Sequence, residues 1–198
     1  MPKIYLLIFI FFLKACVFSE TKHLASLEQE KTYKNMLATP HPLATKEGLA
    51  VLREGGNALD AALTASFMLA VVRPQSTGLG GGGFALVHKN KQTRAFDFRE
   101  RAPLLAGKDM FLTPSGESRD FLYKGIRLKR ASLNGHLAAG VPGFVKGWLK
   151  LHKIYGSLPL KRLLRPAIKW AQNGVRVNKS LESAIFYRLG VLRAFKES

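Results

Sequence analysis

The chain has 198 residues, of which 47% are hydrophobic, so it is long enough to bury one ordinary core. It carries 31 Lys and Arg residues against 13 Asp and Glu residues, and its formal net charge of +18 favours anionic partners such as nucleic acid, a membrane surface or acidic small molecules. Its one cysteine, Cys16, excludes an intramolecular disulfide and a cysteine-rich metal site.

The N-terminus has the plan of a secretory signal peptide. An apolar run from Ile4 to Leu13 follows a cationic start and precedes small residues, and it is shorter than the roughly 20 residues of a membrane-spanning helix. We expect a signal peptide over residues 1–19, with cleavage before Glu20. The alternative is a lipoprotein box, "LKAC", in which Cys16 would be acylated, although Lys14 is unusual there. The mature chain is therefore expected to be exported, periplasmic or secreted, with a lipid anchor at Cys16 as the alternative.

Residues 20–34 are polar and unpatterned, and we interpret them as a leader before the folded part, residues 35–198. The segment "NMLAT" at residues 35–39 is compatible with a short strand. The next segment, "HPLATKEGLAVLREGG", predicts a helix, because Pro42 suits a first helical position and Gly55–Gly56 make a stop signal.

A second helix is predicted to begin at once, over "NALDAALTASFMLAVV". Asn57 is a good N-cap residue, and Asp60 stands at the third helical position, where a carboxylate suits the helix dipole. From Ala58 to Val72 the helix is small or apolar on every side, so we expect it to be buried in the core.

A glycine-rich loop follows this helix in "STGLGGGGFALV". Its glycines satisfy the pattern G-x-G-x-x-G at Gly78, Gly80 and Gly83, but a dinucleotide fold needs the order strand, glycines, helix, and here the order is reversed. A nucleotide site is therefore disfavoured. We expect instead that the glycines let backbone segments pack closely, with a connector without function as the open alternative.

Two alternating runs, Phe84–His88 and Thr93–Glu100, flank a short polar turn and predict a β-hairpin with two apolar stripes. Residues 102–139 look rich in loops. Three helices are then expected, in "GVPGFVKGWLKLHKIYG", in "LPLKRLLRPAIKWAQNG" with an interruption near Pro166, and in "NKSLESAIFYRLGVLRAFKES".

The order of three motifs carries a resemblance to a known family. The segments are "HPLATKEGLAVLREGGNALDAALTASFMLAVVRPQSTGLGGGGFALV", "FDFRERAP" and "AAGVPGFVKGW". From about Lys34 to Asn178 the chain closely resembles the N-terminal part of γ-glutamyltranspeptidases, with a cephalosporin or glutaryl acylase as the looser alternative. The resemblance implies an α+β fold that is part of the N-terminal-nucleophile hydrolase αββα four-layer sandwich, incomplete in this chain.

The resemblance also implies an activity. Members of the family are made as precursors that cleave themselves, and the new N-terminal threonine of the small subunit attacks the γ-glutamyl carbonyl of glutathione or a related compound. The acyl-enzyme then passes the γ-glutamyl group to an amino acid, a peptide or water. This mechanism is chemically reasonable, because the α-amine of an N-terminal threonine can activate its hydroxyl and the transfer goes through a covalent intermediate. The expected partners are thus glutathione, an acceptor and a small subunit, with no cofactor, no metal and no nucleic acid.

One residue of the family site carries over. Arg99 in "DFRERAP" matches the arginine that binds the α-carboxylate of the γ-glutamyl group, and a guanidinium presents a planar fork of donors that lysine cannot copy. Its neighbours Glu100 and Arg101 are left as structural residues or supporting partners.

No catalytic residue is assigned. The family's Thr-Thr-His cleavage motif does not occur in the 198 residues. Other nucleophiles and histidines lack a triad arrangement or metal-ligand spacing; they are Ser76, Thr77, Ser132, His41, His88 and His136. The leading hypothesis is therefore a part of a γ-glutamyltranspeptidase that lacks the nucleophile, and the alternatives are a non-catalytic exported remnant or a basic surface-binding protein. Because the basic residues are widely spread, most of the charge is expected on the solvated surface.

Overall fold

The computed structural model describes residues 34–195, and the elements below all belong to the unit Leu37–Ser198. The predicted signal peptide with Cys16 and nearly all of the predicted leader lie outside the described residues. Among the helices of the described part, none combines the length and the apolar character that a membrane crossing requires.

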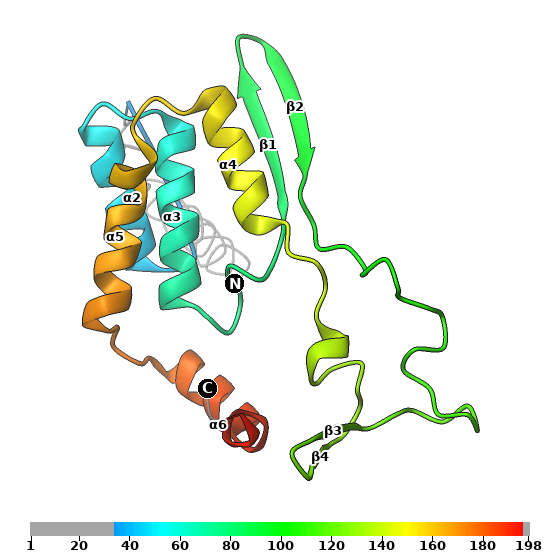
Figure 1. Ribbon diagram of the computed structural model, residues 1–198. Helices are drawn as coiled ribbons and strands as arrows, with labels where there is room; N and C mark the ends of the chain where they lie inside the picture. The colour runs from blue at the N-terminus through cyan, green and yellow to red at the C-terminus, as the bar shows by residue number, and fades with distance from the viewer. Residues whose placement is uncertain (1–33, 196–198) are drawn as a thin grey trace, which may run out of the picture. The chain divides into compact units, whose positions relative to one another are not determined.

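Four helices and one hairpin share the main core. Helices α2 (Pro42–Arg53), α3 (Ala58–Val72), α4 (Phe144–Tyr155) and α5 (Leu160–Asn173) contribute buried side chains to it, and the antiparallel hairpin of β1 (Phe84–Lys89) and β2 (Gln92–Asp97) packs against it. Figure 1 shows the β1–β2 hairpin alongside α4. The prediction of mixed helix and strand is confirmed.

A second, smaller cluster is built from residues later in the chain. It combines the short hairpin of β3 (Phe121–Tyr123) and β4 (Ile126–Leu128) with helix α6 (Lys179–Ala194), and a 3₁₀ turn, η1 (His136–Ala138), precedes α4. Apolar side chains of these segments meet there, among them Phe121, Leu128 and Ala194. The helix expected in "NKSLESAIFYRLGVLRAFKES" is thus present, with Asn178 as its N-cap.

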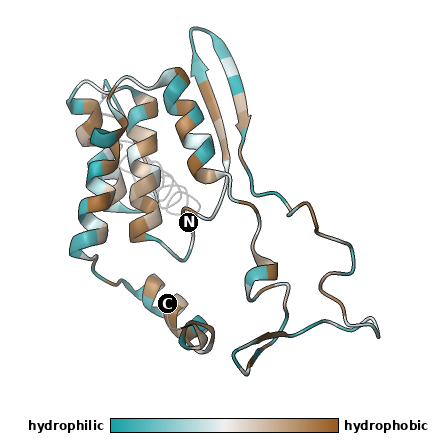
Figure 2. Ribbon diagram, viewed as in Figure 1, coloured by the Kyte–Doolittle hydropathy of each residue, from teal (hydrophilic) through white to brown (hydrophobic). Residues whose placement is uncertain are grey.

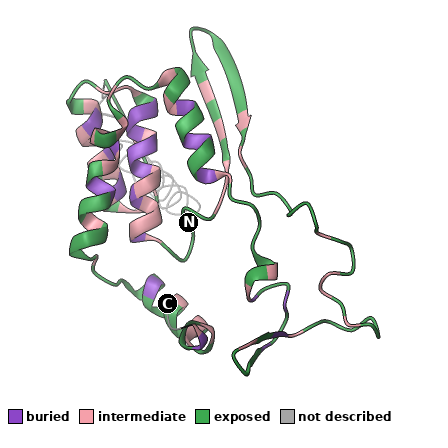
Figure 3. Cartoon of the chain, viewed as in Figure 1, coloured by how far each residue is buried: buried purple, intermediate pink, exposed green. Residues whose placement is uncertain are grey.

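Helix α3 is the most enclosed element, as expected from its composition. Apart from Ala58, none of its residues is exposed, and the buried side is visible in Figure 3, while Figure 2 shows its hydrophobic character. The hydroxyl of Thr64 donates a hydrogen bond of 3.0 Å to the carbonyl of Leu163, so the one buried hydroxyl of α3 is satisfied by α5.

The N-terminus of α3 also holds the turn between α4 and α5. Asn57 and Asp60 form the predicted cap reciprocally, because the Asn57 side chain accepts from the N–H of Asp60 and the Asp60 carboxylate accepts from the N–H of Asn57. The fully buried Asp60 carboxylate further accepts from the N–H and the hydroxyl of Ser157. The Asn57 amide donates to the carbonyl of Tyr155 at 2.7 Å. One local cap therefore fixes a turn almost a hundred residues further along the chain.

Helix α2 begins where the sequence indicates, at Pro42. The residue before it, His41, acts as the N-cap, because its Nδ1 accepts the N–H of Leu43 at 3.2 Å. Partial burial, and secondarily the positive charge of Arg73, lower the pKa of His41. A neutral imidazole at this position is what the cap requires, since protonated Nδ1 cannot accept.

Three details differ from the sequence predictions. Residues 35–39 form no strand. Helix α5 runs through Pro166 without interruption, because Pro166 and Ala167 are buried by packing, and this burial outweighs the loss of one backbone hydrogen bond. The β3–β4 hairpin lies within the region expected to be loops, and its turn residues Lys124 and Gly125 both adopt positive φ, as a type I′ turn needs.

The β1–β2 hairpin is confirmed, with Asn90 and Lys91 at positive φ in its turn, but β2 ends at Asp97 rather than Glu100. Its two apolar stripes lie on opposite faces. Phe84 and Leu86 are exposed, whereas Phe96 packs on the core together with Ala85 and Val87. The register explains this, because Phe84 pairs with Asp97 and Ala85 with Phe96, and successive residues of a strand alternate between faces.

The buried cap of α3 is tested by the substitution Asp60→Ala. It leaves the N–H groups of Asn57 and Ser157 without their acceptor, so the free energy of unfolding of the chain should fall by roughly 2–4 kcal/mol. Urea unfolding followed by circular dichroism measures the change. The matched control is Asp109→Ala, an exposed carboxylate, which should shift the free energy by less than about 0.5 kcal/mol. Equal effects of the two substitutions would show that the cap is not a stabilising element.

Candidate functional site

The glycine loop after α3 is a point of close backbone approach. A Cβ atom on Gly82 would lie 2.7 Å from the nitrogen of Glu100, closer than any real side chain tolerates. Gly83 and Phe98 exchange two backbone hydrogen bonds of 3.0 and 3.3 Å, which continue the hairpin ladder towards the loop. The expected steric role is therefore confirmed at Gly82, while Gly78 and Gly80 have open space around them and are not required for packing.

A second pair of glycines brings the start of α4 to the same place. Added Cβ atoms at Gly143 and Gly147 would both come closer than 3.0 Å to Phe98. The carbonyl of Gly81 accepts the N–H groups of Gly143 and Phe144 at 3.0 and 2.9 Å. The glycine loop, the segment after β2 and the first turn of α4 are therefore held together around Phe98.

Backbone hydrogen bonds between Arg101 and Val141 close this junction. The N–H of Arg101 donates to the carbonyl of Val141 at 3.2 Å, and the N–H of Val141 donates back at 2.8 Å. This isolated bridge joins the segment after β2 to the segment before α4, so the side chains on both segments have a fixed backbone spacing.

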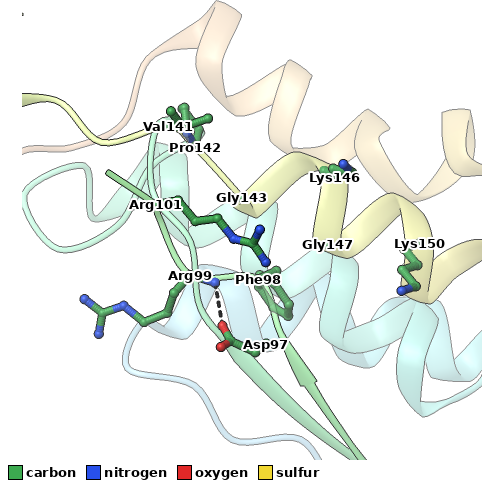
Figure 4. A pocket seen from close by; sticks show the side chains of 10 residues that line it. All are labelled: Asp97, Phe98, Arg99, Arg101, Val141, Pro142, Gly143, Lys146, Gly147 and Lys150. Carbon is green, nitrogen blue, oxygen red and sulfur yellow. Dashed lines mark hydrogen bonds between the residues drawn. The ribbon is translucent and has the colours of Figure 1, made fainter. Parts of the chain in front are cut away.

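The junction lines an open pocket of about 480 Å³ (Figure 4). Its walls come from the end of β2 with the segment after it, and from the beginning of α4. The lining residues are Asp97, Phe98, Arg99, Arg101, Val141, Pro142, Gly143, Lys146, Gly147 and Lys150. Four of these side chains are cationic and one is acidic, so the cavity is suited to an anionic ligand.

Arg99 stands two residues beyond the end of β2, at the rim of this cavity. Its guanidinium carbon lies 5.8 Å from the centre of the exposed Phe84 ring, and its Nε lies 3.5 Å from a carboxylate oxygen of Glu100. Its backbone N–H donates to Asp97 at 2.9 Å. The side chain is 64% exposed, and Figure 4 shows it directed away from Lys146 and Lys150. The fork of donors is therefore accessible to a carboxylate that approaches from outside.

Arg101, Lys146 and Lys150 are the lining cations that the sequence analysis did not assign to a site. Lys146 and Lys150 are one helical turn apart on α4, and Figure 4 shows the Arg101 side chain reaching towards that helix. The i, i+4 spacing of the two lysines was a usable signal. Their proximity to Arg101 depends on the bridge between distant backbone segments, which no local pattern indicates.

Three of the other candidate nucleophiles and histidines make structural contacts. Ser76 accepts a hydrogen bond of 3.2 Å from Arg73, His88 lies 2.8 Å from the hydroxyl of Thr93 across the hairpin, and the His136 ring packs on Phe121. Residues 34–195 contain no group of three or more His, Cys, Asp and Glu side chains arranged to hold a metal ion.

The β3–β4 hairpin carries much of the basic run "YKGIRLKR". Desolvation acts to raise the pKa of Asp120, but the hydrogen bond from the N–H of Arg130 and the nearby Lys129 lower it overall. Asp120 therefore serves as the local counter-ion in this hairpin, with Lys129 at 3.3 Å.

Comparison with known proteins gives one family. The family model described as gamma-glutamyltranspeptidase matches residues 44–197. The glutathione hydrolase proenzyme of Escherichia coli is 44% identical over 147 residues, which are 74% of this chain and 24% of that protein. The corresponding proenzyme of Bacillus subtilis is 41% identical over 152 residues, 76% of this chain and 24% of that protein. The chain thus spans about a quarter of the length of these curated relatives.

Solved structures agree. The crystal structure of Helicobacter pylori gamma-glutamyltranspeptidase matches with a TM-score of 0.74 and 38% identity, over 85% of this chain and 46% of that one. The cephalosporin acylase of Bacillus halodurans matches with a TM-score of 0.62 and 27% identity, over 85% of this chain and 32% of that one. The predicted fold class, part of an N-terminal-nucleophile hydrolase, is confirmed by these neighbours.

The close packing around Phe98 is tested by Gly147→Ala. The new Cβ would overlap the Phe98 ring, and overpacking of this kind should lower the free energy of unfolding by about 1–3 kcal/mol. Gly190→Ala in α6 is the matched control, because a Cβ there meets nothing within 4 Å and alanine favours a helix, so stability should rise by about 0.5–1 kcal/mol. Thermal or urea unfolding of both variants measures the difference, and a neutral Gly147→Ala would contradict the packing argument.

Proposed function

Because the chain belongs to the γ-glutamyltranspeptidase family, we propose that it forms part of an enzyme that hydrolyses glutathione and related γ-glutamyl compounds or transfers their γ-glutamyl group. The observation that carries this proposal is the position of Arg99. It combines the family's "FRERAP" context with an accessible guanidinium at the rim of a cationic cavity.

The proposed role of the chain in the reaction is binding and orientation. The fork of Arg99 pairs with the α-carboxylate of the γ-glutamyl group, which places the γ-carbonyl at a fixed distance from that anchor. Glu100 lies beside the guanidinium and restricts its orientation. The glycine contacts with Phe98 hold the backbone that carries Arg99, so the anchor is set by the fold rather than by a free loop.

The nucleophile comes from a second part of the enzyme in this proposal. The 198 residues contain no Thr-Thr-His sequence, and the relatives are named as proenzymes. A threonine at the new N-terminus of a small subunit attacks the γ-carbonyl, with its own α-amine accepting the hydroxyl proton. The α-ammonium returns this proton to the amine that leaves, and the acyl-enzyme is resolved by an acceptor amino acid, a peptide or water.

Export is part of the same proposal, and its support is the sequence of residues 1–19. N-terminal sequencing of the chain recovered from outside the cytoplasm should begin at Glu20. A chain that begins at Cys16 and carries a fatty acid would support the lipoprotein alternative instead of cleavage before Glu20. A chain retained in the cytoplasm with Met1 intact would contradict export altogether.

A prediction on activity follows from the absence of the nucleophile. The purified 198-residue chain should not hydrolyse a γ-glutamyl anilide, and activity should require co-expression of the remaining C-terminal portion of a relative, which includes the threonine-led small subunit. Release of the chromogenic aniline measures both reactions. Turnover by the chain alone, above a mock preparation, would contradict the proposed division of labour.

The second prediction concerns Arg99 in the reconstituted enzyme. Arg99→Lys keeps the charge but loses the planar fork, and hydrogen bonds to charged groups contribute on the order of 1.5–3 kcal/mol. The KM for γ-glutamyl donors should therefore rise by roughly one to two orders of magnitude, with a smaller change in kcat.

Two controls accompany this measurement. Glutaryl donors lack the α-carboxylate, so Arg99→Lys should affect them far less. The same comparison of donors distinguishes a γ-glutamyl enzyme from a glutaryl acylase. Arg176→Lys, at an exposed arginine outside the cavity, should leave both KM values within about twofold. Equal losses on the two donor types would require the assignment of Arg99 to be withdrawn.

A further inference from the structure

We propose that Arg101, Lys146 and Lys150 form a second anion site, separate from Arg99, that binds a compact ligand with two or more phosphate or carboxylate groups. The three side chains line the same cavity of about 480 Å³. They come from two segments about forty residues apart, which the bridge between Arg101 and Val141 and the contacts of Phe98 with Gly143 and Gly147 hold together.

The backbone around this cavity is built to a fixed spacing. The carbonyl of Gly81 is shared by the N–H groups of Gly143 and Phe144, and Phe98 packs against both glycines of the first turns of α4. The backbone segments that carry the three cations therefore have a defined spacing before a ligand binds, and a ligand has to order only the exposed side chains.

Positive charge exceeds negative charge in this cavity, with the three cations and Arg99 against one carboxylate. Within residues 34–195, none of the three makes an ion pair with Asp or Glu. The one acidic lining residue, Asp97, accepts the backbone N–H of Arg99. The partial positive charge at the N-terminus of α4 adds to the same field, because Gly143, Lys146 and Gly147 all belong to its beginning. A multivalent anion would neutralise several of these charges at once.

The site is distinct from the rim occupied by Arg99. The Arg99 guanidinium lies over Phe84 and beside Glu100, and in Figure 4 it is directed away from α4. Arg101 is directed the other way, towards α4. A pocket of about 480 Å³ between two segments favours a small anion over a long polyanion such as nucleic acid, which would spread over the exposed basic residues of α5 as well.

The test is isothermal titration of the purified 198-residue chain with inorganic tripolyphosphate and, separately, with citrate, at physiological salt. Saturable binding of one anion per chain is expected for at least one of the two probes, and the tighter probe assigns the site to phosphate or carboxylate ligands. The double substitution Lys146→Gln with Lys150→Gln should weaken that binding at least about tenfold. Arg101→Gln leaves α4 intact and provides an independent second variant, with a similar expected loss.

The matched control is Lys161→Gln with Arg165→Gln, which removes two exposed cations at the same i, i+4 spacing on α5. It should change the dissociation constant by no more than about twofold, and Arg99→Lys should behave likewise. Circular dichroism of each variant checks that the helices are retained.

Absence of saturable binding, or equal losses in the control, would overturn the site. A loss in Arg99→Lys as large as in Arg101→Gln would overturn its separation from the substrate anchor. None of these results depends on glutathione turnover, so failure of this site and failure of the proposed function are distinguishable.

Discussion

The packing of Phe98 against glycine is the constraint on which the candidate site depends. Gly143 and Gly147 face Phe98 at distances that exclude a Cβ atom, and Gly82 is equally close to the backbone beside it. The Phe98 ring also packs near Trp148, at 6.2 Å between ring centres, and so connects the junction to the main core. Because this aromatic residue is held from several sides, the segment that follows it, with Arg99 and Arg101, has a defined course.

The second anchor of the structure is the buried cap at the start of α3. The Asp60 carboxylate accepts hydrogen bonds both from the N-cap of its own helix and from Ser157 in the turn after α4. The Asn57 amide donates to the carbonyl of Tyr155 at the end of α4. This arrangement positions α4 from its C-terminal end, while the glycine junction positions it from its N-terminal end. Lys146 and Lys150 are thus carried on a helix that is fixed at both ends, which is the condition a binding site needs if its side chains are to be preorganised.

Charge on this chain has different consequences in different places. On the outer face of α5 the basic residues are solvated, and Figure 2 shows hydrophilic residues alternating with hydrophobic ones around that helix. Glu54 pairs with Arg162, and Asp120 offsets Lys129. At the cavity, Arg101, Lys146 and Lys150 make no ion pair among the described residues, while Arg99 pairs with Glu100. The positions of Arg99, Arg101, Lys146 and Lys150 therefore indicate more about a binding partner than the net charge of +18 does.

The sequence by itself determined what local chemistry controls. The cap of α3, the burial of that helix, the β1–β2 hairpin and the family motif around Arg99 follow from neighbouring residues, because capping, alternation and turn conformation act within a few positions. The tertiary structure alone decided that Phe84 and Leu86 are exposed and that α5 continues through Pro166. It also decided that Arg101, Lys146 and Lys150 line one cavity. In each case the deciding contacts join segments far apart in the chain, where burial and backbone spacing outweigh local preference.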